Sequence, residues 1–257
     1  MELSLHSKIK GHGEPIILLH GLFGASDNLG RLSTSLCDQY QVHSLDLRNH
    51  GRSPHSDQMN YQLMANDVHA YLIKQNIDRV RILGHSMGGK VAMKFALEFP
   101  ERVNKLIVVD IAPVAYPAHH EQVFKGLLSV NLQEIKSRAE ADKALSEYIL
   151  EQSVRQLLLK SLTRDTEGNF AWKINVHAIY QNYPNILSGL SADKPYRSDV
   201  LFVAGGLSDY LKASDKNEIL KLFPKATIRV IPKAGHWLHV EKPELFLGIC
   251  ERFLKEV

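Results

Sequence analysis

Short runs of apolar and β-branched residues alternate with helical patterns along most of this chain. The runs are SLHSKIK (4–10), IILLH (16–20), VHSLDL (42–47), VRILG (80–84), KLIVVDI (105–111), VLFVAG (200–205) and TIRVI (227–231). Helical patterns fall between them, over 26–37, 62–75, 87–98, 213–222 and 242–255. Runs this short and this continuously apolar are typical of parallel strands buried on both faces. The alternation predicts an α/β fold, with a mostly parallel central sheet of about seven to eight strands flanked by helices.

Two segments depart from this alternation. The turn sequence GHGEP joins the first two strands, and we expect an antiparallel hairpin there, at the N-terminus. The stretch between the fifth and sixth strands has no good strand pattern and is interpreted as about three to five helices, with 132–150 and 152–162 the clearest. A helical insertion between two strands of a parallel sheet is typical of a cap. We therefore expect a core made of 1–111 and 199–257, and a helical cap over 112–198.

Composition and charge exclude several classes of protein. The formal net charge is only +3 and no block of Lys and Arg occurs, whereas nucleic-acid binding needs clustered positive charge. The first residues lack the apolar core of a secretory signal, and no run reaches the roughly 18 apolar residues of a membrane span. Cys37 and Cys250 lie far apart, without metal-ligand spacing. We expect reduced thiols in a cytoplasmic protein.

The stretch GHSMGGK (84–90) places a serine between glycines where a strand pattern gives way to a helix pattern. A chain that turns this sharply strains the residue at the corner, and side chains at Gly84 and Gly88 would clash there. The turn holds the Ser86 hydroxyl above the sheet, at a helix N-terminus that favours developing negative charge. We therefore expect Ser86 to be a nucleophile.

A nucleophilic serine needs a base, and the base needs an orienting acid. In hydrolases with this turn the chain order is serine, acid, histidine. His236, in GHWLH (235–239) after the last strand, is the expected base, with His239 as its rival; a two-histidine metal site lacks a third ligand nearby. The acid is Asp110, which ends the apolar run KLIVVDI, or Asp209, in the loop after VLFVAG. Position in the sequence leaves both open.

The glycines of HGLFG (20–24) let the backbone approach a substrate, so this loop is expected to supply one N–H group that binds an oxyanion. The two donors would be the backbone N–H groups of Leu22 and Met87, with Phe23 as the alternative to Leu22. His20 is expected to support this loop with its ring. In the same way, we expect Asp46, Arg48 and Asn49 in DLRNHGRSP (46–54) to hold loops near the site by hydrogen bonds.

Five stretches carry a resemblance to a known family: HGLFG, DLRNHGRSP, GHSMGGK, DIAPVAY and GHWLHVEKP. In these stretches the chain resembles the α/β-hydrolases, and among them the YbfF-type bacterial esterases and their mitochondrial relatives. The resemblance runs nearly end to end and is weakest in the cap. It implies a triad of Ser86, Asp110 and His236. It also implies that Ser208, in GGLSDY, occupies the usual acid position and supports the triad. Members of this family hydrolyse short-chain carboxylic esters and, by implication, acyl thioesters such as acyl-CoA.

The expected function is that of a serine hydrolase acting on a small acyl ester or thioester, by chemistry that requires no metal or cofactor. One rival is a lyase or C–C bond hydrolase that uses the same triad. Such enzymes usually clamp anionic substrates with cap arginines, for which Arg138, Arg155 and Arg164 are candidates. The other rival is a non-catalytic binding protein, expected to lack a triad residue or an oxyanion glycine. The sequence carries no signal for a particular oligomeric state.

Overall fold

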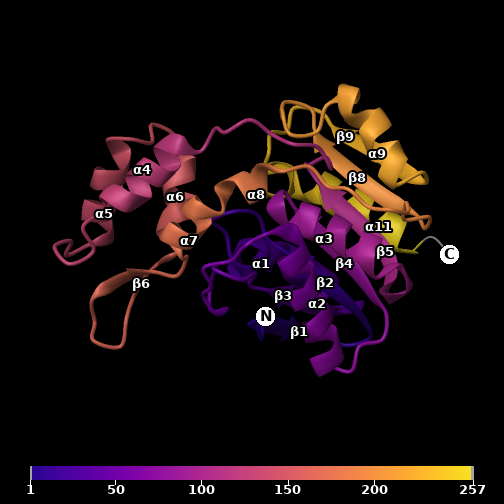
Figure 1. Ribbon diagram of the computed structural model, residues 1–257, viewed down its shortest axis with the longest axis horizontal. Coiled ribbons are helices and arrows are strands. Elements are labelled where there is room, and N and C mark those ends of the chain that lie inside the picture. Colours follow the sequence, from indigo (N-terminus) through magenta and orange to yellow (C-terminus); the bar gives the residue numbers. More distant parts are fainter. Residues whose placement is uncertain (1, 256–257) are drawn as a thin grey trace.

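The computed structural model describes residues 2–255 and has the predicted α/β architecture. Its main sheet has seven strands in the order β1-β3-β2-β4-β5-β8-β9, and all of them except β1 run in the same direction (Figure 1). All seven strands expected from the sequence are present. They are β1 (Ser7–Lys10), β2 (Glu14–Leu19), β3 (Tyr40–Leu45), β4 (Val80–His85), β5 (Val103–Val109), β8 (Val200–Gly205) and β9 (Ala226–Ile231).

Helices cover both faces of the sheet, and the strand side chains alternate between two buried clusters. Ile17 and Leu19 of β2 belong to one cluster, and Ile16 and Leu18 of the same strand belong to the other. This period of two is the signature of a strand buried on both faces. The first cluster includes side chains of α2 (Tyr61–Lys74), α3 (Met87–Glu98) and α9 (Lys216–Leu222), whereas the second includes those of α1 (Gly30–Leu36) and α11 (Pro243–Lys255).

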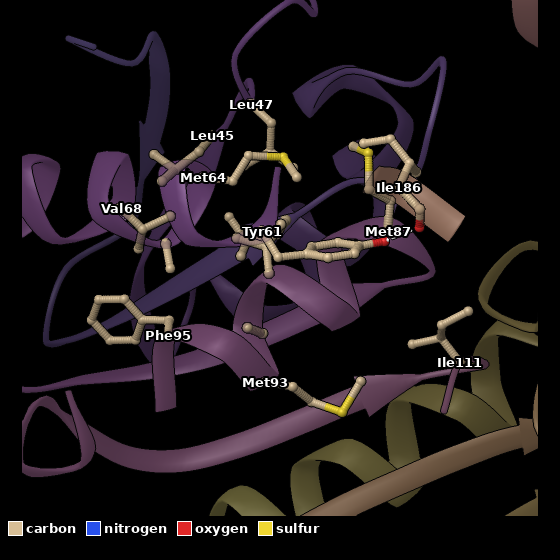
Figure 2. Close-up of a cluster of buried hydrophobic side chains, with 14 of the residues drawn as sticks. Leu45, Leu47, Tyr61, Met64, Val68, Met87, Met93, Phe95, Ile111 and Ile186 are labelled. Atoms are coloured by element: carbon tan, nitrogen blue, oxygen red, sulfur yellow. Dashed lines mark hydrogen bonds between the residues drawn. The ribbon is translucent and has the colours of Figure 1, made fainter. Parts of the chain in front are cut away.

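Figure 2 shows part of the first cluster, where α2 and α3 meet above the sheet. Tyr61 begins α2 and extends toward Met87 and Ile186, and its hydroxyl donates a hydrogen bond of 2.6 Å to the carbonyl of Ile186. Asn60 caps α2 by accepting from the Leu63 N–H at 2.9 Å. The core thus extends from the sheet to a residue of the cap. No helix within residues 2–255 is long and apolar enough to cross a membrane.

The N-terminal strand is antiparallel, as expected, but its partner is β3, so the expected hairpin with β2 is wrong. The connection crosses from one side of β3 to the other, since β2 pairs with the opposite edge of that strand. Gly11 makes this crossing possible, with φ at +76°. A Cβ atom there would lie 2.2 Å from the carbonyl oxygen of Cys37 and 2.4 Å from that of Tyr40. The glycine-rich turn signal was therefore correct about a sharp turn and wrong about strand pairing.

The segment between β5 and β8 forms a largely helical cap, which projects from one end of the sheet (Figure 1). The expectation that it has no strand is wrong, because β6 (Leu162–Arg164) and β7 (Phe170–Trp172) form a small antiparallel hairpin. The two clearest expected helices are also shorter than expected. The cap helices are α4 (Glu121–Ser129), α5 (Arg138–Ser146), α6 (Gln152–Leu159), α7 (Val176–Gln181) and α8 (Tyr183–Leu187).

Short helices complete the chain. A 3-10 turn precedes α1 and another precedes α9, so the helices expected over 26–37 and 213–222 are each divided into two pieces. A further short helix, α10, lies between the loop that carries His236 and α11. The three 3-10 segments are Ser26–Leu29, Pro100–Arg102 and Ala213–Asp215, and α10 spans Leu238–Glu241.

Candidate active site

Ser86 lies at the corner between β4 and α3, and its backbone is strained, with φ 53° and ψ −121°. The flanking glycines allow this turn because they have no side chains. A Cβ atom on Gly84 would lie 2.2 Å from the carbonyl oxygen of Gly88. A Cβ atom on Gly88 would lie 2.4 Å from the carbonyl oxygen of Leu19 and 2.6 Å from that of His20. The glycines thus let α3 approach β4 and the end of β2 closely.

Three side chains from separate strand ends form one hydrogen-bonded chain. The Ser86 hydroxyl lies 3.0 Å from Nε2 of His236, and Nδ1 of that ring lies 2.7 Å from Oδ2 of Asp110. Because an ionised carboxylate only accepts, Nδ1 carries the proton and Nε2 accepts from the serine hydroxyl. This tautomer is the one that a histidine needs to remove a serine proton.

The structure brings Asp110, and not Asp209, to the histidine. Asp110 is fully buried, and its carboxylate accepts from the Gly205 N–H at 2.8 Å and from the Ser208 hydroxyl. Three donors, one of them the His236 ring, therefore compensate the cost of burying it. Asp209 is 93% exposed and lies 3.2 Å from the Lys212 ammonium. Ser208 makes the contact with the acid that the family resemblance implied.

The loop after β2 lies directly against the serine. A Cβ atom on Gly21 would lie 3.3 Å from the Cβ of Ser86, so only a glycine fits comfortably there. Leu22 follows it, and its backbone N–H has no acceptor among the described residues. Met87 is the first residue of α3, where N–H groups have no intrahelical acceptor. Leu22, Ser86 and Met87 all line the same cavity, and the N–H groups of Leu22 and Met87 are the expected oxyanion donors.

Phe23, the alternative donor, is engaged elsewhere. Its N–H donates to Nε2 of His50 at 3.2 Å. Its φ is 62°, and its ring packs edge-on against that of Phe124, with the centroids 5.3 Å apart. The geometry therefore favours Leu22 over Phe23.

The ring of His20 supports this loop, as expected. Its Nε2 accepts from the Leu47 N–H at 3.0 Å. Burial lowers the pKa of His20, so the ring is neutral near pH 7. Asp46 also joins loops, because its carboxylate accepts from the N–H groups of Ser26 at 2.6 Å and Arg52 at 2.9 Å.

Arg48 and Asn49 hold the loop that follows β3. The Arg48 guanidinium makes a bidentate pair with Asp67 on α2, at 2.7 and 2.8 Å, and both side chains are buried. The Asn49 side chain accepts from the Ser56 N–H at 2.7 Å, and its φ is 65°. The expected structural contacts of these residues are therefore present.

Several histidines surround His236, and burial keeps them neutral. His85 donates from Nε2 to the carbonyl of His236 at 2.9 Å, and burial lowers the pKa of His85 well below its usual value. Burial lowers the pKa of His239, the rival base, to about 4. The His239 ring packs against His85, with centroids 4.5 Å apart, rather than against the serine. His236 is therefore the ring that joins Ser86 to the acid.

Sequence reasoning missed two residues that line the site, Lys90 and Tyr210. The Lys90 ammonium donates to the carbonyl of Val114 at 2.7 Å and to that of Ser188 at 2.6 Å. Val114 lies near the start of the cap and Ser188 near its end, so Lys90 joins both ends of the cap to α3. It also lies 4.7 Å from the ring centroid of Tyr116. Burial lowers the pKa of Lys90 to about 7. The available signal was a lysine in the helix pattern that follows the turn at Ser86, because the other buried residues of α3 are apolar or glycine.

A cavity of about 790 Å³ lies between the cap and the carboxyl ends of the strands, and Ser86 and His236 open into it. This volume falls in the range of pockets for small organic ligands. Apolar side chains of the cap form much of its wall, among them Val123, Ile149, Val154, Leu157 and Leu158.

None of the three candidate arginines in the cap lines this cavity. Arg155 pairs with Asp142 at 2.8 Å, Arg138 donates to cap carbonyls, and Arg164 donates to the carbonyl of Gly168. They hold the cap together and form no clamp for an anionic substrate. No cluster of three or more potential metal-ligating side chains occurs among residues 2–255.

Comparison with known proteins agrees with the observed fold. Residues 14–243 match the family model described as alpha/beta hydrolase fold. The chain is 37% identical to esterase YbfF of Escherichia coli, covering 95% of this chain and 94% of that one. It is 38% identical to the sn-1-specific diacylglycerol lipase ABHD11 of Mus musculus, covering 93% and 80%. A solved structure, a marine microorganism esterase, superposes with a TM-score of 0.96 at 43% identity, covering 98% of this chain and 100% of that one.

Proposed function

The chain belongs to the α/β-hydrolase fold family, and we propose that it is a serine hydrolase that cleaves carboxylic esters through an acyl-enzyme intermediate. The observation that carries the proposal is the unbroken hydrogen-bonded chain from the Ser86 hydroxyl through His236 to Asp110. Relatives that match over most of their length are an esterase and a lipase, which supports the same reaction class.

In the first half of the reaction, the serine oxygen attacks the acyl carbonyl while Nε2 of His236 accepts the serine proton. Asp110 holds the ring in the productive tautomer and stabilises the imidazolium. The Leu22 and Met87 N–H groups receive the negative charge that develops on the carbonyl oxygen. The imidazolium then gives its proton to the leaving alcohol.

In the second half, His236 activates a water molecule that attacks the acyl-enzyme, and the acid product leaves. The protein groups are the same, because deacylation is the first half with water in place of the alcohol. A thiol can replace the alcohol as leaving group, so we extend the proposal to acyl thioesters such as acyl-CoA, the second substrate class expected from the resemblance.

The cap, 112–198, is proposed to be a separate unit that selects the substrate and takes no part in the chemistry. Its apolar side chains supply much of the cavity wall, while the triad and the oxyanion donors come from the core. A cavity of about 790 Å³ with a mostly apolar wall can hold an apolar acyl chain together with a small alcohol.

The experiment compares hydrolysis of p-nitrophenyl esters of graded chain length, and of acyl-CoAs, by the wild type and by Ser86→Ala. Loss of the nucleophile is expected to lower kcat by on the order of 10⁶, as measured for subtilisin. Ser153→Ala is the matched control, because Ser153 lines the same cavity from the cap. Activity of Ser86→Ala within tenfold of wild type would exclude the proposed mechanism. Hydrolysis of acidic diketones in place of esters would instead identify a C–C bond hydrolase.

A further inference from the structure

The ring of Tyr210 stacks on the imidazole of His236. The ring centroids are 3.9 Å apart and the planes differ by 24°. His85 lies against the same imidazole at a greater distance, with centroids 4.8 Å apart and planes inclined by 42°. The proposed base is thus in contact with two aromatic rings, of which Tyr210 is the closer and the more nearly parallel.

Three polar contacts fix the position of Tyr210. Its hydroxyl bonds to Nε2 of His119, whose Nδ1 lies 2.8 Å from the carbonyl of Pro117. Since a carbonyl only accepts, Nδ1 of His119 carries the proton and the Tyr210 hydroxyl donates to Nε2. The Tyr210 carbonyl accepts from the Tyr116 hydroxyl, and its N–H donates to the Ser208 hydroxyl at 3.3 Å. Residues of the cap and of the core therefore jointly fix the position of this ring.

The carboxylate of Asp110 contacts the His236 ring at Nδ1, at 2.7 Å. The three histidines His85, His120 and His239 near the ring are neutral at pH 7, because burial lowers their pKa values. Burial raises the pKa of Tyr210 to about 12, so its phenol stays protonated. His119 contacts Tyr210 and not the base. An imidazolium formed at His236 therefore faces Asp110 along its edge and the π face of Tyr210 along its plane.

We propose that Tyr210 is a positioning residue whose ring fixes the plane of the His236 imidazole and whose π face stabilises the imidazolium formed as Ser86 loses its proton. This inference rests on the proposed function. The face of an aromatic ring carries negative quadrupole density and attracts a cation, most strongly where water is excluded. Neutral imidazole gains less from that face, so the contact strengthens in the transition state and accelerates the reaction.

The first experiment separates the ring face from the hydroxyl. Tyr210→Leu keeps apolar cover over His236 but removes the π face, and kcat is expected to fall about tenfold, or about 1.4 kcal/mol. Tyr210→Phe keeps the face and loses only the bond to His119, so kcat should stay within about threefold of wild type. Leu207→Ala is the control in the same loop, because that side chain is 74% exposed. KM should change little in all three variants.

The pH profile of kcat/KM gives a readout that a purely structural role would not move. Without the π face the imidazolium is less stable, so the ring loses its proton at lower pH. The midpoint of the acid limb should therefore move down by up to about one pH unit in Tyr210→Leu, and should not move in Tyr210→Phe. An unchanged midpoint in Tyr210→Leu, or equal shifts in both variants, would overturn the inference.

If the leucine variant does not fold, Tyr210→pentafluorophenylalanine tests the same inference. Fluorination reverses the charge of the ring face at almost constant shape, so kcat should fall below that of Tyr210→Phe. Equal kcat values would contradict the inference. NMR titration of the His236 ring, assigned with His236→Asn, repeats the pH test without turnover. The two proposals can therefore fail separately: an active Ser86→Ala excludes the proposed function, whereas an unmoved titration in Tyr210→Leu excludes only the role of Tyr210.

Discussion

Replacing Gly88 by alanine tests how the turn around the serine is built. A Cβ atom there would lie 2.4 Å from the carbonyl oxygen of Leu19, whereas real Cβ atoms essentially never approach closer than 3.0 Å. The end of β2 and the start of α3 must then separate by more than about half an ångström. Because β2 leads directly into the loop that carries Leu22, and α3 begins with Met87, the separation moves the two proposed oxyanion donors apart.

The expected cost follows from that displacement. A misplacement of about 1 Å at a catalytic group costs on the order of 10²-fold, so Gly88→Ala should lower kcat by about 10- to 100-fold. Crowding the core should also destabilise the fold by about 1–3 kcal/mol.

Gly248→Ala is the matched control. This glycine lies within α11, and nothing is found within 4 Å of an added Cβ atom. Here alanine should stabilise the fold by about 0.4–1 kcal/mol, because it restricts the unfolded chain, and leave kcat unchanged. The assay is kcat for p-nitrophenyl acetate, with urea unfolding and circular dichroism on each variant. If Gly88→Ala were as active as Gly248→Ala, the reasoning about close approach would be wrong.

Three further results are expected. Asp110→Asn should lower kcat by up to about 10⁴, the cost of the wrong histidine tautomer in trypsin, whereas Asp209→Asn should cost little; a steady-state comparison in which only Asp209→Asn is inactive would contradict the assignment. Burial lowers the pKa values of His50 and His120 to about 3, so the unfolded chain binds more protons between about pH 6.5 and 3, and stability is lost as pH falls through that window. Urea unfolding should show a loss of roughly 1.4 kcal/mol per pH unit for each such ring, and equal midpoints at pH 7.5 and 5 would refute this. Val154→Phe, which narrows the cavity from the cap, should lower kcat/KM for long acyl esters more than for acetate, and an equal loss across the ester series would count against a selective cap.

The strands were predictable because a strand buried on both faces leaves a short continuous apolar run. The pairing of β1 was not, since it depends on the crossing that Gly11 permits, and turn residues in the sequence do not record which strand lies on the other side. The strands β6 and β7 have three residues each, too few to show a period of two. The pairing of β1 and the formation of β6 and β7 therefore depend on tertiary contacts, which sequence periodicity does not record.

At the candidate site, the order of motifs indicated the strand ends that meet, but not the choice between two aspartates. Asp110 and Asp209 both follow strands, and only the fold shows that the first turns inward, with φ at 52°, to reach His236. Tyr210 and Lys90 carried no motif. Their contacts arise where the loop after β8 and the two ends of the cap converge, and residues far apart in the sequence give no local signal of such a meeting.

The central claim, that Ser86 is the activated nucleophile, is tested most directly by a fluorophosphonate, which labels only a serine activated by its base. Intact mass and peptide mapping of the wild type should show one adduct, on Ser86. Ser86→Ala and heat-denatured wild type should show none, and His236→Asn should react much more slowly. An adduct on a different residue, or none on the folded wild type, would contradict the account.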